Sequence, residues 1–412
     1  MASGEAPTRP GRRLVTIDIL RGFALFGVLL VNMGLFKSTL FYWDKAPGDY
    51  AESLNIFFAW SVELLAEGKF YPIFSFLFGL GFYLFAARAK AKGLEAIPLY
   101  RRRIFGLLIM GFIHLFFIWS GDILHIYAIT GFILLKLSHI SDKNIKKLII
   151  VLFCLSLVLQ GGIKFSESMV LEGEVETEMG LDPQEERLAL KESALSTYQQ
   201  GNFVEILRFR LFNEVPYVLL NLFFSLPDIL FLFLLGLYVG RKKILAEIPH
   251  HAGLLKKTLK RCFTVGVSGM IVYYFLRASF LEVTPLWQSS IETMVFYAAS
   301  ISIAVAYIAL ISLLTQKDLF SKLLHPLSYV GRMALTNYLT QSIICVSLFY
   351  GYGAGWFGQV SVVQGVLLTV AIYAVQIFWS WAWLTYYQFG PFEWLWRCFT
   401  YQKIFPIKKM AG

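Results

Sequence analysis

Long apolar runs separated by short polar segments dominate the chain. A helix needs about 20 apolar residues to span a bilayer, and shorter helices serve where they pack inside a bundle. The pattern therefore predicts an all-α fold, a polytopic integral membrane helix bundle with about ten transmembrane helices. The predicted spans are residues 17–36, 70–87, 104–119, 122–137, 148–162, 216–240, 262–280, 291–314, 328–350 and 362–387.

Charged residues interrupt the apolar run that precedes the second predicted span. Glu63, Glu67 and Lys69 fall within seven residues, although the surrounding positions are mostly apolar. A charged side chain is costly in hydrocarbon. Residues 55–67 are therefore expected to form a re-entrant or interfacial helix and not a full span.

Basic side chains fall in alternate connections between the spans. They concentrate in the N-terminal segment and in residues 88–103, 143–147 and 241–261, whereas residues 166–193 are strongly acidic. Because basic loops stay on the cytoplasmic side, this alternation predicts that both termini are cytoplasmic and that the acidic segment is external. No small-residue cleavage site follows the first apolar run, which favours a retained span over a removed signal peptide.

Five segments describe the predicted organisation. They are a cytoplasmic N-terminal tail (1–16), an N-terminal membrane bundle (17–163), an acidic external loop with an amphipathic helix (164–213), a C-terminal membrane bundle (214–388) and a cytoplasmic interfacial tail (389–412). The acidic loop is either a lid over an external opening or only a solvated connector.

Composition agrees with this organisation. Of 412 residues, 57% are hydrophobic and 16% charged, and the mean hydropathy is +0.62, far more apolar than average soluble usage. The formal net charge of +10 would suit nucleic acid, but the basic residues lie between membrane spans, which argues against that partner. Four scattered cysteines have no metal-ligand spacing, and no metal site is expected.

Three ionisable residues surround the turn at 120–122 between the third and fourth spans: His114, Asp122 and His125. At a rise of 1.5 Å per residue, His125 lies roughly 4.5 Å beyond Asp122, so both approach His114 across the hairpin. A His oriented by a carboxylate is suited to proton transfer or to attack on a thioester. The alternative is a buried polar cluster that only joins the two helices.

Polar residues also interrupt other spans. Arg21 forms an i,i+3 pair with Asp18, and Asn32 lies three turns along the same face. Arg21 either extends to the membrane interface or binds a phosphate or carboxylate in a cavity that opens inward. Asp228 follows Pro227 within the sixth span, where a transporter would place a substrate or coupling-ion site and an enzyme could place a cavity wall.

The ninth span carries a polar face, which serves either binding or interhelical packing. Its members are Arg332, Thr336, Asn337, Gln341 and Ser342, with Tyr338 beside them. In the C-terminal tail, Glu393 and Arg397 form an i,i+4 pair among tryptophans, a pattern typical of anchoring at the membrane interface.

Five stretches together resemble the YeiB-like bacterial membrane proteins, whose C-terminal half is a domain of unknown function, family 418. They occur in the same order over nearly the whole chain. The stretches are Ile17-Asp-Ile-Leu-Arg-Gly-Phe-Ala-Leu-Phe-Gly27, Glu67-Gly-Lys-Phe-Tyr-Pro-Ile-Phe-Ser-Phe-Leu-Phe-Gly79, Trp119-Ser-Gly-Asp-Ile-Leu-His125 with Tyr127, Gly331-Arg-Met-Ala-Leu-Thr-Asn-Tyr338 and Gly390-Pro-Phe-Glu-Trp-Leu-Trp-Arg397.

That family resembles, more distantly, the transmembrane acyltransferases, which carry an acyl group from cytoplasmic acyl-CoA to an acceptor on the far side through a membrane-embedded His. The resemblance implies an acyl-CoA-dependent acyltransferase of the bacterial cytoplasmic (inner) membrane. The acyl group, such as acetyl, would go to a small-molecule, glycan or lipid acceptor. His114 is the position matched to the family's His, with His125 as a competitor and Asp122 as the orienting carboxylate.

The resemblance also suggests the binding residues. Those expected to hold acyl-CoA are Arg21, Arg101, Arg102, Arg103, Arg332 and Asn337. Those expected to line the substrate site are Asn32, Trp119, Tyr127, Asp228, Tyr338 and Gln341. Arginine suits this role because its guanidinium matches the geometry of phosphate oxygens.

Two other classes of function stay open at this point. A secondary transporter or flippase would use Asp228 and Arg21 to bind substrate or protons, around a midplane site between pseudo-symmetric halves. A structural or regulatory membrane protein would use the polar clusters only for helix packing. An enzyme would instead require a cavity that joins the inner arginines to His114. The lipid bilayer is a partner in every case, and a homodimer is an open alternative.

Overall fold

A computed structural model describes residues 14–39, 53–171, 183–278 and 285–409, and the regular elements within them are helices. The predicted all-α fold is therefore confirmed. The α-helices are α1 (Val15–Phe36), α2 (Ser53–Leu65), α3 (Phe70–Ala91), α4 (Ala96–Ile113), α5 (Leu124–Leu137), α6 (Asp142–Leu171), α7 (Pro183–Gln200), α8 (Phe203–Phe209), α9 (Val215–Arg241), α10 (Ile248–Arg277), α11 (Pro285–Leu314), α12 (Asp318–Arg332), α13 (Ala334–Phe349), α14 (Val362–Tyr386) and α15 (Pro391–Tyr401). Two π-helical turns are η3 (His114–Ile118) and η4 (Arg210–Glu214).

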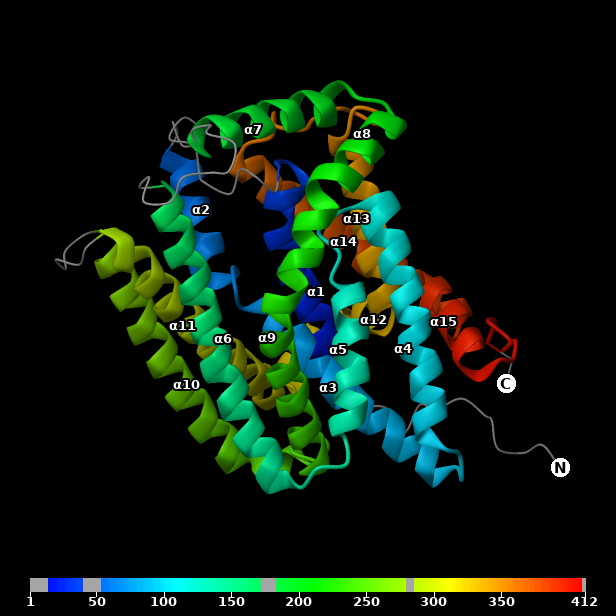
Figure 1. Ribbon diagram of the computed structural model, residues 1–412. Coiled ribbons are helices and arrows are strands. Elements are labelled where there is room, and N and C mark those ends of the chain that lie inside the picture. Colours follow the sequence, from blue (N-terminus) through cyan, green and yellow to red (C-terminus); the bar gives the residue numbers. More distant parts are fainter. Residues whose placement is uncertain (1–13, 40–52, 172–182, 279–284, 410–412) are drawn as a thin grey trace.

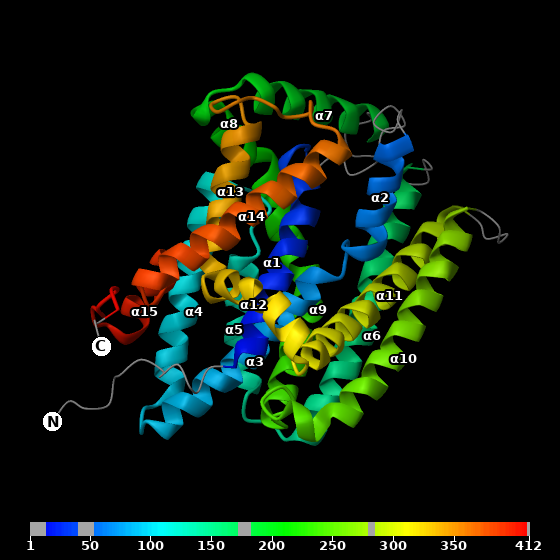
Figure 2. The same ribbon diagram turned by 180° about the vertical axis from the view of Figure 1, so that it is seen from behind.

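The long helices run alternately up and down between two ends of the molecule (Figure 1). The connections α3–α4, α5–α6 and α9–α10 lie at the lower end, and α7 crosses the upper end. Seen from behind, α13 rises to the upper end and α14 runs obliquely down to α15 (Figure 2). Lys92, Lys143 and Lys242 lie in or beside the lower connections. The basic connections thus share one end of the bundle.

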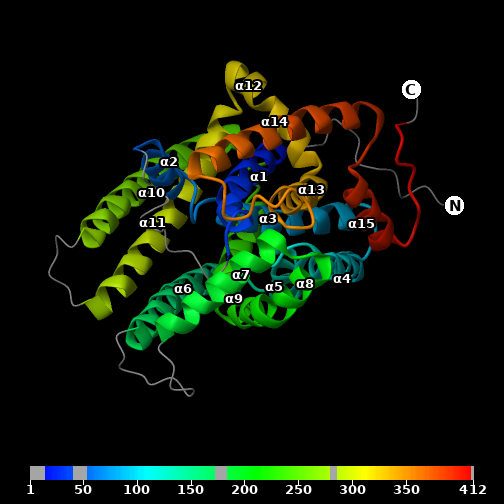
Figure 3. The same ribbon diagram turned by 90° about the horizontal axis from the view of Figure 1, so that it is seen from above.

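Helix α1 is the centre of the bundle. Viewed from above, the α10–α11 pair lies on one side of it and α4, α5 and α15 on the other (Figure 3). Side chains of α1 are buried from Ile17 at its beginning to Phe36 at its end, because α3, α11, α12, α13 and α14 all pack against it. An apolar helix surrounded in this way needs no polar face.

In the described part of the chain, six helical stretches are long and apolar enough to cross a membrane. They are Val15–Phe36, Ser53–Ala91, Asp142–Met169, Phe203–Arg241, Trp287–Leu314 and Val362–Tyr386. Two shorter apolar helices, Leu124–Leu137 and Ala334–Phe349, accompany them. Residues 104–119 and 262–280 lie mainly in α4 and α10, which are less apolar over their length. The total of ten spans and the cytoplasmic placement of the termini stay predictions.

The segment predicted to be a separate short helix before the second span is α2, and it ends in a turn that carries buried charges. Gly68 has a φ of +75°, and the fully buried Lys69 donates through Nζ to the carbonyl of Glu63 at 2.8 Å. The Glu63 carboxylate accepts hydrogen bonds from Tyr273 at 2.7 Å and Arg277 at 2.5 Å on α10. The charged residues that interrupt the apolar run therefore pair with one another and with α10.

The predicted ninth span is wrong as a single helix, because the chain breaks at Met333 between α12 and α13. A Cβ at Gly331 would lie 1.8 Å from the carbonyl oxygen of Asp18, so α12 crosses α1 in backbone contact. The Glu393 carboxylate accepts hydrogen bonds from the N–H groups of Leu335 at 2.7 Å and Thr336 at 3.1 Å. Arg332 therefore lies on a different helix from the rest of the predicted polar face.

The segment predicted to be an acidic external loop contains helices. Its described part comprises the end of α6, then α7, α8 and most of η4, and α7 lies across the upper end of the bundle (Figure 1). Residues 172–182 of this segment lie outside the described residues. The side chain of Asn202 caps α8 by accepting from Val204 and Glu205, which stabilises the start of a helix.

We expect Glu393→Ala to lower the stability of the protein. The substitution leaves two backbone N–H groups at the beginning of α13 without their acceptor, and loss of a helix cap costs about 1 kcal/mol. Thermal unfolding in detergent measures the effect. Glu247→Ala, which removes a carboxylate that lies 3.9 Å from Lys243 at the exposed lower end, is the matched control. Equal melting temperatures for the two variants would contradict the capping role.

Candidate functional site

The predicted His hairpin is built from the end of α4, the turn η3 and the beginning of α5. Helix α4 widens into a π turn at His114, where the N–H of Trp119 donates to the carbonyl of His114 at 2.8 Å. A Cβ at Gly111 would lie 2.4 Å from the backbone nitrogen of His125, so the two helices touch at this level. π turns are rare in proteins, but those that do occur are often found at functional sites.

Asp122 joins the two histidines. Its Oδ1 lies 2.8 Å from Nδ1 of His114, and its Oδ2 lies 2.7 Å from Nδ1 of His125. The backbone N–H of His125 donates to the same Oδ2 at 2.8 Å. All three side chains are buried. The structure thus brings together the three residues that the sequence singles out for catalysis.

The Nε2 atom of His114 is buried and has no hydrogen-bond partner among the described residues. A buried polar atom without a partner is costly and calls for an explanation. Because Asp122 holds Nδ1, the free nitrogen is the one that can accept a proton from, or attack, a bound molecule. This arrangement has the geometry of a carboxylate-oriented base.

Aromatic side chains enclose the His114 ring. The ring of Tyr338 on α13 lies 5.3 Å away and that of Trp119 6.3 Å away, between centroids. The hydroxyl of Tyr338 accepts from the N–H of Ile123 at 3.3 Å, and Trp119 stacks on Phe36 of α1 at 4.0 Å. Two of the predicted substrate residues, Trp119 and Tyr338, therefore border the catalytic candidate and shield it from water.

A second π turn, η4, meets the first one, and the sequence analysis did not single out its residues. Arg210 at its beginning is buried and donates through Nη1 to the carbonyl of Phe116 in η3 at 3.3 Å. Its Nε and Nη2 make no hydrogen bond of ordinary geometry in the described part of the chain, although the hydroxyls of Tyr198, Tyr350 and Tyr352 lie close enough to interact with the guanidinium. These two atoms form the side-on edge of the guanidinium, which binds carboxylate or phosphate with two parallel hydrogen bonds.

Tyrosines and one carboxylate surround Arg210. Its guanidinium lies 5.7 Å from the ring centroid of Tyr350. Tyr198 on α7 donates to Glu214 at 2.8 Å, and burial raises the pKa of Tyr198, so its hydroxyl keeps the proton that it donates. The only sequence signal for this cluster was an Arg and a Glu at i,i+4 at the start of a long apolar run.

Asp228 forms a separate buried cluster on α9. It accepts a hydrogen bond from the hydroxyl of Tyr297 on α11, and Tyr71 on α3 is a further partner. Tyr127 lies beside this cluster, since its hydroxyl is 2.7 Å from Ser75 and donates to the carbonyl of Tyr71 at 3.2 Å. Tyr127 and Asp228, two of the predicted substrate residues, therefore lie in a polar cluster around Tyr71 and not at the His114 ring.

The side-chain N–H groups of the amides predicted to bind ligands have protein partners, whereas Oδ1 of Asn337 has none among the described residues. Asn337 donates to Ser380 at 2.9 Å and Gln341 donates to Gln376 at 2.8 Å, both on α14. Gln376 in turn donates to the carbonyl of Asn337 at 2.9 Å. These contacts agree with the packing alternative. Asn32 is half-buried on α1.

The predicted inner arginines divide into two groups. Arg21 pairs with Asp18 at 3.0 Å, and Arg103 lies close enough to Arg21 and Arg397 to interact with both electrostatically. The Arg103 guanidinium also stacks 3.5 Å from the Trp396 ring of α15. Arg101 and Arg102 are exposed, and Arg332 ends α12. The structure gathers Arg21 and Arg103 and leaves the exposed pair outside.

Two surface hollows of the described chain lie away from these groups. One, of about 440 Å³, lies between α12 and α14, and the other, of about 390 Å³, lies beside α8 and η4. Neither is lined by His114 or by the inner arginines. The predicted cavity that joins the arginines to His114 is therefore not among them and stays a prediction.

The fold and the buried polar site define a multi-span α-helical membrane protein. Residues 239–403 match the family described as Protein of unknown function (DUF418). The chain is 32% identical to the uncharacterized protein YxaH of Bacillus subtilis, over 99% of both chains, and 26% identical to the uncharacterized protein YeiB of Escherichia coli, over 94% of this chain and 96% of that one. A third relative, an uncharacterized 39.9 kDa protein of Bacillus acidopullulyticus, is 30% identical over 97% of both. The chain belongs to the DUF418 family, as the resemblance predicted.

We expect Asp122→Asn to destabilise the protein strongly. An amide cannot accept from both Nδ1–H groups and the His125 N–H as the carboxylate does, and each buried donor left without an acceptor costs about 1–3 kcal/mol. Thermal unfolding checks this.

The control is Asp142→Asn, which weakens an ion pair with Arg241 whose Asp side chain is 36% exposed. Pairs of that kind contribute about 0–1 kcal/mol. If both variants melt at the same temperature, Asp122 does not hold the hairpin together.

Proposed function

We propose that the protein transfers an acyl group from acyl-CoA, bound at the lower end, to an acceptor that approaches from the upper end. The observation that carries the proposal is the free Nε2 of the buried His114, whose Nδ1 is held by Asp122. A polar cluster used only for packing would gain stability by pairing that nitrogen as well. The unpaired atom is instead available to a substrate.

The proposed chemistry follows from the two nitrogens. Nδ1–H donates to Asp122, which keeps the Nε2 lone pair free and stabilises the imidazolium once Nε2 gains a proton. Nε2 removes the proton from an acceptor hydroxyl or amine as that group forms a bond to the thioester carbonyl carbon. The C–S bond then breaks, and the proton passes from Nε2 to the CoA thiolate. His125 is a positioning residue that anchors the second carboxylate oxygen.

The predicted orientation of the protein in the membrane supports this direction of transfer. The basic connections share the lower end, which the positive-inside rule assigns to the cytoplasm, where acyl-CoA is found. Arg21, Arg103 and Arg397 interact there, and, although Arg21 is paired with Asp18, three neighbouring guanidinium groups leave a local excess of positive charge that favours an anion. The phosphates of CoA supply such an anion.

Arg210 supports an acceptor site at the upper end. Its unpaired side-on edge is suited to a carboxylate or phosphate group, and its contact with Phe116 connects it to the π turn that carries His114. In this proposal Arg210 orients an anionic acceptor above the His hairpin. Because His114 is fully buried, both substrates reach it only after Tyr338 and its helix α13 move away from the ring.

A proton-coupled transporter is the second candidate, and the Asp228 cluster favours it. A buried carboxylate beside Pro227, hydrogen-bonded by Tyr297, is a group that can take up and release a proton during alternating access. The two proposals differ in their dependence on CoA.

Thermal stabilisation by acetyl-CoA and longer acyl-CoAs tests the proposed function. A ligand that binds only the folded state raises the melting temperature by mass action. We expect acyl-CoA to stabilise the unaltered protein. Its affinity should fall at least about tenfold in Arg21→Gln and be retained in His114→Gln. The rate of acyl transfer or thioester hydrolysis should fall about a hundredfold or more in His114→Gln.

Arg208→Gln is the matched control, because Arg208 is an exposed arginine of α8 at the upper end, and it should leave CoA binding unchanged. Absence of stabilisation by every CoA species would overturn the acyltransferase proposal. Proton or solute flux that depends on Asp228 in vesicles would then favour transport.

A further inference from the structure

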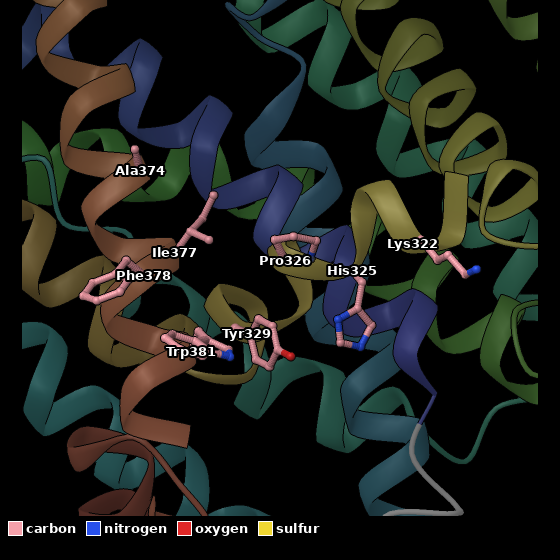
Figure 4. A pocket seen from close by; sticks show the side chains of 8 residues that line it. All are labelled: Lys322, His325, Pro326, Tyr329, Ala374, Ile377, Phe378 and Trp381. Carbon is pink, nitrogen blue, oxygen red and sulfur yellow. The ribbon is translucent and has the colours of Figure 1, made fainter. Parts of the chain in front are cut away.

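A groove lies on the surface of the bundle between α12 and α14. Figure 4 shows Ala374, Ile377, Phe378 and Trp381 of α14 on one side and Tyr329, Pro326 and His325 of α12 beside them; Lys322 of α12 lies at the end of the groove farthest from α14, with its ammonium directed away from that helix. The hollow has a volume of about 440 Å³. Because it opens on the outside of a membrane bundle, something from its surroundings must fill it.

The α14 wall of the groove is apolar and faces outward. Phe378 is 66% exposed and Trp381 49% exposed, a degree of exposure that suits contact with acyl chains and not with water. Trp379 and Tyr386 are exposed on the same helix. Trp and Tyr gather where a membrane meets water, so the lower part of α14 lies near that interface.

The α12 wall supplies a cation. Among the described residues, Lys322 has no hydrogen-bond or ion-pair partner, and its side chain is exposed at the edge of the groove. The ring of His325 packs edge-on against Tyr329 at 5.2 Å, which places a hydroxyl and an imidazole in the same hollow. One end of an apolar groove therefore carries donors for an anion.

We propose that the groove binds one anionic phospholipid of the leaflet at the lower end of the bundle. The phosphate contacts Lys322, and an acyl chain lies along Ile377, Phe378 and Trp381. Charge complementarity decides the headgroup, because an unpaired ammonium near the surface attracts anionic lipids by about 1 kcal/mol. The apolar wall decides against free phosphate, which would leave Phe378 and Trp381 uncovered. This inference is independent of the proposed acyl transfer.

Native mass spectrometry of the full-length protein tests the proposal, with phosphatidylglycerol and phosphatidylcholine of identical acyl chains added separately. We expect tighter binding of phosphatidylglycerol by the unaltered protein and a roughly fivefold loss of that preference in Lys322→Gln. Lys317→Gln is the matched control: Lys317 is at the beginning of the same helix, 6.0 Å from the Phe320 ring and outside the groove. It should keep the preference.

Ala374→Trp fills the groove and should release both lipids. Phe378→Ala is a second variant that weakens acyl-chain contact without adding bulk, and circular dichroism establishes that each variant is folded. Four results would overturn the proposal: an unchanged preference in Lys322→Gln, an equal loss in Lys317→Gln, full displacement of the lipid by inorganic phosphate, or a dimer that Ala374→Trp dissociates. The last result would assign the groove to a second copy of the chain.

Discussion

Every other feature of this structure depends on one constraint: inside a membrane bundle, polar groups must find their partners within the protein. The chain meets it at each place where a helix is interrupted. Lys69 donates to the carbonyl of Glu63 at the break between α2 and α3, Glu393 accepts from the first N–H groups of α13, and Asp122 holds two histidines at the turn after η3. Against this background, Nε2 of His114 and the Nε and Nη2 atoms of Arg210 are among the buried polar atoms of the described residues that have no hydrogen-bond partner.

The two π turns explain how a buried polar cluster is held in an otherwise apolar bundle. A π turn leaves backbone carbonyls displaced from the regular ladder, and one of them, that of Phe116 in η3, receives Arg210 from η4. The contact joins the upper helices to the hairpin that carries His114. In such a low-dielectric region, a carboxylate orients a neighbouring His more strongly than in water.

Sequence reasoning succeeded where the chain is short between the partners. Only seven residues separate His114 from Asp122, so a turn at 120–122 brings the two side chains close together. It failed where distant segments decide. The break at Met333 depends on the contact of Gly331 with Asp18 and on the cap by Glu393. Both partners are distant in the sequence, so the residues around Met333 do not predict the break. The role of Arg210 depends likewise on Phe116 and Tyr350.

Helix α12 connects the centre of the bundle to its outer surface. Its Gly331 lies in backbone contact with Asp18, the residue that pairs with Arg21, while its other side forms the wall of the groove that contains Lys322. A helix held so tightly against α1 cannot shift without moving the Asp18–Arg21 pair, because close-packed interfaces transmit displacement instead of absorbing it. The wall of the groove and the Asp18–Arg21 pair are therefore joined by a single helix.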